Sequence, residues 1–164
     1  MFCASVCVAA ALEPHTVTTS QQGIHKWKVA GGTLIGIAGT EADTVTYRRS
    51  FSFYFQEKDD AELMHVPIVG GRDDYAMTWY TAGQGDNTDE DAVAVLNNGK
   101  LHLIIVARQK SGNALKLTKY LLVHDDPDFP DGPSSVFKKI STQSRPIKQS
   151  QDVDAALLRQ LANM

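Results

Sequence analysis

The sequence DTVTYRRSFSFYF, residues 43–55, carries the clearest pattern in the chain and decides the fold class. Large apolar side chains occupy every second position over most of this stretch, and polar side chains lie between them. Successive side chains of a β-strand point to opposite faces of a sheet, so the alternation predicts a strand with one buried and one solvated face. The expected buried set is Val45, Tyr47, Phe51, Phe53 and Phe55, and the expected solvated set is Thr44, Thr46, Arg48, Ser50 and Ser52.

On both sides of this stretch the chain keeps the two-residue period of strands more often than the period of a helix. The strongest hairpin signal is Asn98-Gly99, because these two residues tolerate the positive φ of a type I′ turn. Gly31-Gly32 marks a second turn. Strands are predicted over residues 16–19, 24–30, 33–38, 62–69, 75–81, 92–96, 100–108, 114–124 and 136–140.

Residues 150–164, SQDVDAALLRQLANM, have a different pattern. Their apolar residues recur at helical spacing, and Ser150 or Asp152 can cap the first turn. The apolar set is Val153, Ala156, Leu157, Leu158 and Leu161. The sequence therefore predicts a mainly β fold with a C-terminal α-helix, in which an antiparallel meander or sandwich-like sheet is packed by one helix.

The first twelve residues, MFCASVCVAAAL, contain no charge and run into Glu13-Pro14. This pattern is typical of the apolar part and cleavage zone of a secretory signal peptide. We expect residues 1–12 to be a signal-peptide remnant, residues 13–164 to form a single β-rich domain, and the protein to be periplasmic. The alternative is a short buried N-terminal helix or strand of a cytosolic protein.

Charge and hydropathy limit the partners of the chain. The net charge of −3, with no basic run longer than a pair, argues against a binder of nucleic acid, which would carry a basic stripe. No apolar run reaches the roughly 18 to 20 residues that a membrane helix needs. We therefore expect no nucleic-acid partner and no membrane span.

No catalytic motif is complete in the sequence. Ser135 and Lys138 form an S-x-x-K pattern like that of β-lactamases, but the S-x-N that begins at Ser111 precedes it and no K-T-G exists. The five histidines lack metal-ligand spacing, and the acidic loops do not match a calcium-binding loop. We expect no catalytic residue, no cofactor and no metal site, while acid–base chemistry by loop carboxylates stays open.

Two aromatic and three acidic residues are the candidates for a ligand or partner surface. Aromatic residues in strands more often belong to a core, and acidic residues in loops are more often simply solvated. The candidates are Trp79, Tyr80, Asp86, Asp89 and Asp128.

Four stretches of the chain resemble the intrinsic carbapenem-resistance protein family of the CarG type. They are TYRRSFSFYF (residues 46–55), the polar loop before residues 101–108, KLTKYLLVHDDPDFPDGPSSVF (residues 116–137) and QDVDAALLRQL (residues 151–161). Members of this family are periplasmic proteins that protect producers of carbapenem antibiotics without being recognised β-lactamases.

The resemblance implies a non-catalytic periplasmic self-resistance protein. Its partner would be a β-lactam antibiotic, which it binds, or a cell-wall transpeptidase, which it shields; a homodimer is a further expectation. The main alternative is a periplasmic immunity or inhibitor protein that binds a toxin enzyme. A third is an unrecognised hydrolase that uses loop carboxylates.

Overall fold

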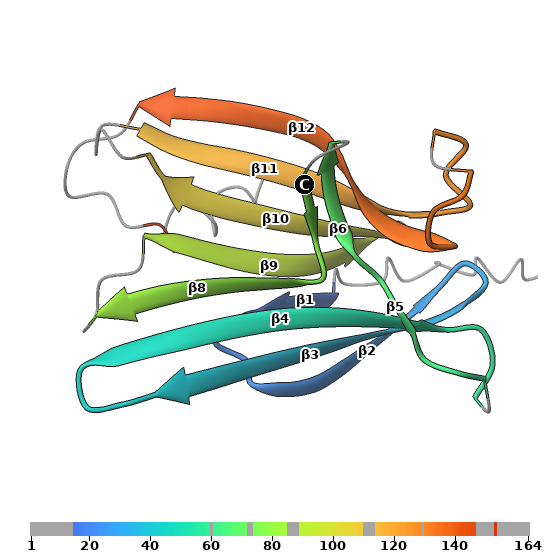
Figure 1. Ribbon diagram of the computed structural model, residues 1–164, viewed down its shortest axis with the longest axis horizontal. Coiled ribbons are helices and arrows are strands. Elements are labelled where there is room, and N and C mark those ends of the chain that lie inside the picture. Colours follow the sequence, from blue (N-terminus) through green and yellow to red (C-terminus); the bar gives the residue numbers. More distant parts are fainter. Residues whose placement is uncertain are drawn as a thin grey trace, which may run out of the picture.

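The computed structural model describes residues 15–59, 61–71, 74–84, 89–109, 114–128 and 130–146, together with Val153. These residues form two β-sheets that pack face to face (Figure 1). The signal-peptide remnant expected over residues 1–12 lies outside this part of the chain. Among the described residues, no helix has the length and apolar character needed to cross a membrane.

The larger sheet has the strand order β1-β9-β10-β11-β12-β6-β7 within the described residues, and the smaller sheet has the order β2-β3-β4-β5, with β8 also paired to β4. Strands β9 to β12 form an antiparallel meander, and β12 pairs with β6 in parallel. The strands are β1 (His15–Thr18), β2 (Gly23–Val29), β3 (Gly32–Ala42), β4 (Thr46–Gln56), β5 (Met64–His65), β6 (Ile68–Gly71), β7 (Asp74–Ala76), β8 (Thr78–Gln84), β9 (Glu90–Asn97), β10 (Lys100–Arg108), β11 (Ala114–His124) and β12 (Ser135–Pro146).

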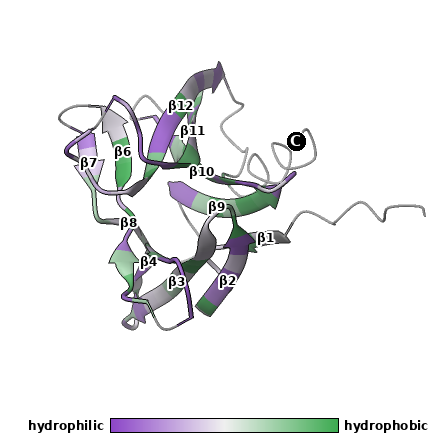
Figure 2. Cartoon of the chain, turned by 90° about the vertical axis from the view of Figure 1, so that its right-hand side faces the viewer, coloured by the Kyte–Doolittle hydropathy of each residue, from purple (hydrophilic) through white to green (hydrophobic). Residues whose placement is uncertain are grey.

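The core lies between the two sheets. Seen end-on in Figure 2, the meander lies over β2 to β4, and along β2 hydrophobic and hydrophilic residues alternate. The core members of β4 are Phe51, Phe53 and Phe55, which are buried as their spacing predicts. Val45 is a correction: it lies in the turn before β4 and is 57% exposed, because the strand begins one residue later.

The sequence predicts a mainly β fold with one C-terminal helix packed on its sheet, and this prediction is wrong. Apart from Val153, which is helical, the regular elements of the described residues are strands. The rest of the helix predicted over residues 150–164 lies outside the described residues. Instead of a helix on a single sheet, a second sheet buries the core, because β2 to β5 supply an apolar face of their own.

The hairpin predicted at Asn98-Gly99 is confirmed. Both residues have positive φ, 49° at Asn98 and 72° at Gly99, and they join β9 to β10. Two consecutive positive φ angles define the type I′ turn, whose twist matches that of the flanking strands. This hairpin fixes the register of β9 against β10 and thereby the position of Glu90 opposite Ala107.

Candidate functional site

Strand β8 separates two candidate binding sites, because its consecutive residues Trp79 and Tyr80 face opposite sides of the smaller sheet. Trp79 pairs with Phe51 of β4, points into the core and is 6% exposed. Tyr80 pairs with Ser50, points outward and is 71% exposed. The structure therefore does not bring these two sequence candidates into one surface.

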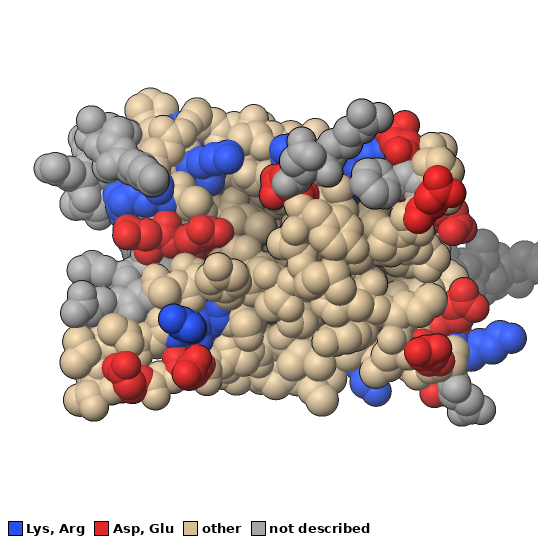
Figure 3. All heavy atoms as spheres, in the orientation of Figure 1, with Lys and Arg blue, Asp and Glu red and all other residues tan. Residues whose placement is uncertain are grey.

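The first site is a cavity of about 270 Å³ between the sheets, which we call the inter-sheet cavity. Its floor is buried, and its rim carries the exposed side chains of Asp74 and Lys116. On the side of the molecule drawn in Figure 3, a hollow lies over β9 and β10, with acidic and basic side chains at its edges. The cavity is lined by Ile68, Asp74, Ala76, Trp79, Glu90, Ile105, Ala107, Lys116, Thr118 and Tyr120.

The ionisable groups of this cavity are held in a partly desolvated environment. The indole N–H of Trp79 donates to Oε1 of Glu90 at 2.8 Å. Burial raises the pKa of the Glu90 carboxyl, while this hydrogen bond and the charge of Lys116 act in the opposite direction. Burial, together with the negative charges of Asp74 and Glu90, raises the pKa of Tyr120 to about 12, so its phenol keeps its proton.

The second site, which we call the outer hollow, lies on the solvent face of the smaller sheet. Strand pairing places Gly39, Ser50 and Tyr80 side by side on three neighbouring strands, with Glu41 beside Arg48 in the next outward row. Because the side chains of Gly39 and Ser50 are small, a depression of about 500 Å³ lies over them. It is lined by Gly39, Thr40, Glu41, Arg48, Arg49, Ser50 and Tyr80.

The outer hollow differs from the inter-sheet cavity in charge. Two arginines face one glutamate, whereas in the inter-sheet cavity two carboxylates face one lysine. The guanidinium of Arg49 lies 4.9 Å from the centre of the Tyr47 ring, a cation–π distance that restrains this arginine. Because both sites lie on β8, one strand presents two environments of opposite charge.

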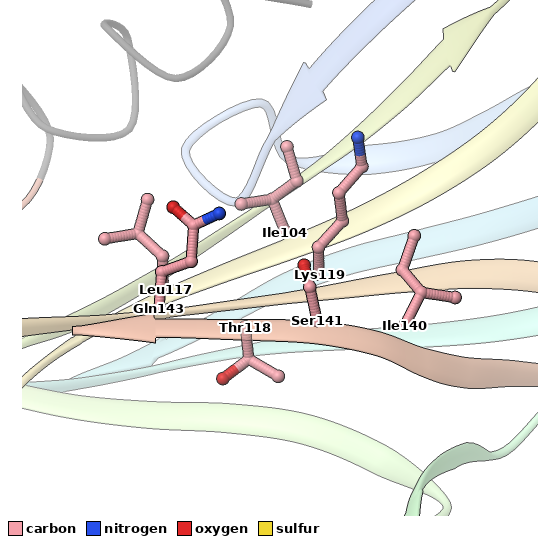
Figure 4. Close-up of a pocket in the computed structure, with 7 residues that line it drawn as sticks. All are labelled: Ile104, Leu117, Thr118, Lys119, Ile140, Ser141 and Gln143. Carbon is pink, nitrogen blue, oxygen red and sulfur yellow. The ribbon is translucent and has the colours of Figure 1, made fainter.

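A further depression of about 270 Å³ lies on the outer face of the larger sheet (Figure 4). Thr118 points away from the other side chains that line it, toward the inter-sheet cavity that it also lines. The depression adjoins an apolar cluster that includes Val153. It is lined by Ile104, Leu117, Thr118, Lys119, Ile140, Ser141 and Gln143.

The three acidic candidates do not meet. Asp89 lies at the start of β9, where its carboxylate is 3.5 Å from Nε of Arg108. Asp128 lies in the loop between β11 and β12, at the opposite end of the sandwich (Figure 1), and pairs with Lys138 at 2.6 Å. Asp86 lies outside the described residues.

The S-x-x-K pattern does not form a serine–lysine pair. Ser135 is buried, and its Oγ lies 2.8 Å from Nδ1 of His124 on the neighbouring strand. Lys138 instead contacts the carboxylates of Asp126, at 2.9 Å, and Asp128. In the described part of the chain, no group of three or more histidine, cysteine or acidic side chains could hold a metal ion.

Sequence reasoning missed most residues of both sites. Glu90, Lys116 and Tyr120 come together only through the pairing of β9, β10 and β11. A partial signal exists, because a buried tryptophan needs an acceptor for its N–H and an acidic residue eleven positions along the chain can supply one. For Arg48 the signal is the two-residue period of β4, which places it on the same face as Ser50.

Comparisons with known proteins show the fold of the chain. A search of solved structures finds the crystal structure of CarG, with a TM-score of 0.67 and 15% sequence identity over 90% of this chain and 94% of that one. No protein-family profile and no curated protein sequence matches. The chain therefore shares the fold of CarG, at a low level of sequence identity.

Proposed function

We propose that this protein is a non-catalytic, periplasmic carbapenem-resistance protein that protects a cell by binding the antibiotic. The observation that carries the proposal is the likeness to CarG, which extends over nearly the whole of both chains. It agrees with the resemblance of four sequence stretches to the CarG-type family. A fold by itself does not specify a ligand, and the choice of a carbapenem as the ligand is supported by the chemistry of the outer hollow.

The outer hollow suits a carbapenem better than the inter-sheet cavity does. A carbapenem carries a carboxylate on a compact fused ring system. The Arg48 guanidinium can pair with that carboxylate through two parallel hydrogen bonds, and the exposed ring of Tyr80 offers a flat surface for the rings. The inter-sheet cavity would place Asp74 and Glu90 near the same carboxylate, and like charges repel.

The groups around the outer hollow favour binding over hydrolysis. Its hydroxyl groups belong to Thr40, Ser50 and Tyr80, and no histidine, cysteine or lysine lines it among the described residues. A serine hydroxyl is a weak nucleophile unless a neighbouring base takes its proton. The proposal is therefore sequestration of the drug, with the β-lactam ring left intact.

The test is carbapenem susceptibility of a sensitive host that expresses the protein with its signal peptide. The wild type should raise tolerance, while Tyr80→Ala and Arg48→Gln should remove most of the gain. Tyr75→Ala is the matched control, since Tyr75 is an exposed tyrosine on β7 that does not line the outer hollow. Absence of protection by wild-type protein recovered from the periplasm would contradict the proposal.

The fate of the drug separates sequestration from catalysis. Purified protein at stoichiometric concentration should leave the ultraviolet absorbance of the β-lactam ring unchanged over hours. Ser135→Ala should protect as well as the wild type, because Ser135 is buried against His124. Steady loss of absorbance would place the protein among the enzymes.

A protein partner is the second candidate, supported by apolar side chains next to the outer hollow. Ile24 and Ile37 are exposed, and they face each other across the β2–β3 pairing on the solvent side. Exposed apolar residues rimmed by polar ones are typical of protein interfaces. A transpeptidase, a toxin enzyme or a second copy of this chain would fit such a surface. Ile24→Lys should abolish protection if a protein is bound and should leave it unchanged if the drug is bound.

A further inference from the structure

The second half of β12 has a neighbouring strand on one side only. Strand β12 pairs with β11 along its whole length, from Ser135 to Pro146, whereas β6 pairs with it only at Phe137 and Lys138. Residues 139–146 are exposed, and no other strand of the described residues pairs with them (Figure 1). A strand edge with open backbone groups is a template for pairing with a further strand.

One hydrogen bond shows which way the backbone points along this edge. The N–H of Phe137 donates to the carbonyl of Pro67, so the backbone of Phe137 faces away from its β11 partner, Leu122. In an antiparallel pair of strands, positions of this kind alternate with positions that exchange hydrogen bonds. On β11, Thr118 and Lys116 therefore belong to the same series as Leu122 and make no backbone hydrogen bond to β12.

The open backbone groups of β12 belong to Thr142 and Ser144. These two residues are the partners of Thr118 and Lys116, because the bulge at Ile140 adds an extra residue to β12 and none to β11. The N–H and C=O groups of Thr142 and Ser144 therefore point away from β11, out of the sheet edge. An added strand can pair with these groups.

A depression on the outer face of the larger sheet adjoins this edge. Ile140, Ser141 and Gln143 of β12 line it, together with Ile104 and Leu117. Figure 4 shows these side chains on the same side of β12. Since Ile140 is 48% exposed, an aliphatic side chain of an added strand would remove apolar surface from water there. When a strand is added to a sheet, such pockets supply specificity and the backbone supplies affinity.

The charge along the edge is positive. Lys139 and Arg145 are exposed, and residues 135–146 contain no acidic residue. Lys119 adds a further positive charge at the depression. Two copies of this edge that paired about Thr142 would place Lys139 of one opposite Arg145 of the other, and like charges directly opposite destabilise a sheet. The charges therefore favour a partner strand with carboxylates over a second copy of the chain.

We propose that the free edge of β12 binds an extended, acidic segment of a partner protein as an additional strand. The backbone of the segment pairs with Thr142 and Ser144, an aliphatic side chain enters the depression beside Ile140, and carboxylates face Lys139 and Arg145. This edge belongs to the larger sheet and the outer hollow to the smaller one, so the inference does not depend on the proposed carbapenem binding.

The experiment follows hydrogen exchange at the backbone amides of β12 by NMR, in the full chain with and without the blocked acidic peptide ETVLVTE. In the free protein the amides of Thr142 and Ser144 should exchange quickly, and that of Gln143, which faces β11, should exchange slowly. Free peptide at about ten times its Kd should slow exchange at Thr142 and Ser144 about tenfold. Exchange at Gln143 should not change.

A second peptide and three variants test the backbone and the charge separately. The basic peptide KTVLVTK should bind about tenfold more weakly. Thr142→Pro removes an outward N–H at an edge position that tolerates proline, so the fold should persist while peptide binding falls about tenfold or more. Thr142→Val, which keeps the N–H, is the matched control. Arg145→Glu should weaken binding of ETVLVTE about fivefold and strengthen binding of KTVLVTK.

Tyr80→Ala separates a failure here from a failure of the proposed function. This variant should leave peptide binding unchanged while reducing drug tolerance, because Tyr80 lies on the other sheet.

Four results would overturn the inference. Slow exchange at Thr142 and Ser144 in the free protein would show that the chain itself already covers the edge. The others are no slowing by ETVLVTE, equal affinity for the two peptides, and equal peptide affinity in Thr142→Pro and wild type. If Thr142→Pro does not fold, as judged by circular dichroism, Arg145→Glu replaces it, and an unchanged preference for the acidic peptide would count against the inference.

Discussion

Trp79 and Tyr80 are neighbours in the chain, yet their surroundings have little in common. Trp79 lies in the wall of the acidic inter-sheet cavity and donates its N–H to Glu90, whereas Tyr80 lies in an open depression beside Arg48. The difference arises from strand alternation together with the two sheets: a residue of β8 faces either the core or the solvent. A single strand can thus contribute to two sites of opposite charge without any insertion or loop.

The largest effect on stability is expected from truncating Trp79, and truncating Tyr80 is the comparison. Trp79→Ala should lower the free energy of unfolding by about 3 to 5 kcal/mol, because it leaves a cavity and strips Glu90 of its donor. Tyr80→Ala should change it by no more than about 0.5 kcal/mol, since its ring is mostly in water. Urea unfolding measures both variants. Similar losses in the two would show that the inward and outward assignments are wrong.

A smaller effect is expected at the rim of the inter-sheet cavity. Gly70→Ala forces its new methyl group into the space of the Asp74 carboxylate and should destabilise the fold by about 1 to 3 kcal/mol. Gly71→Ala is the matched control, because a Cβ atom there meets nothing within 4 Å. Equal stability of the two variants in urea would mean that Asp74 moves aside freely.

The pH dependence of stability should report on the carboxyl of Glu90 in the inter-sheet cavity. The pKa of Glu90 in the folded state is raised above its ordinary value of 4.5, so its contribution to stability is complete below that value and is lost as pH rises through the folded pKa. Glu90→Gln has no such loss, so its Tm relative to wild type should rise as the pH increases above about 4.5. A Tm difference between Glu90→Gln and wild type that stays constant with pH would contradict this prediction.

The smallest effect on stability is expected where the outer hollow is filled. Gly39→Ala adds a methyl group 3.4 Å from Oγ of Ser50 and should alter the free energy of unfolding by less than about 0.5 kcal/mol. The same methyl group raises the floor of the hollow, so drug tolerance should fall although the fold is intact. Unchanged tolerance would show that the drug does not bind beside Gly39 and Ser50.

The sequence predicts the residues of the core better than the residues of the candidate binding sites. Phe51 and Phe53 alternate with serines, and Asn98-Gly99 has one favourable turn geometry, so local chemistry suffices to place them. The two-sheet arrangement is different, because the pairing of β1 with β9 and of β12 with β6 joins segments far apart in the chain. Period-two patterns show that strands exist, and they do not specify these partners.

The candidate sites were predicted less well for a related reason. The sequence marks Trp79 and Tyr80 as candidates for a binding surface because both are aromatic, but it does not show that they belong to two different sites. Tyr120 and Glu90 become neighbours only through the strand order of the larger sheet. Asp89 and Asp128 stood out because acidic loops are conspicuous in a sequence, and in the structure each pairs with a basic side chain.

The strands at the margins of the two sheets have a consequence for self-association. In the described residues the larger sheet ends in β1 and β7, of four and three residues, which leave little backbone for another chain to pair with. Within the described residues the smaller sheet ends at β2 on one side and at β5 and β8 on the other, and β2 carries the exposed lysines Lys26 and Lys28. Positive charges along an edge repel a second copy of the same edge. At high protein concentration, these two lysines therefore oppose the pairing of β2 with the same strand of a second copy.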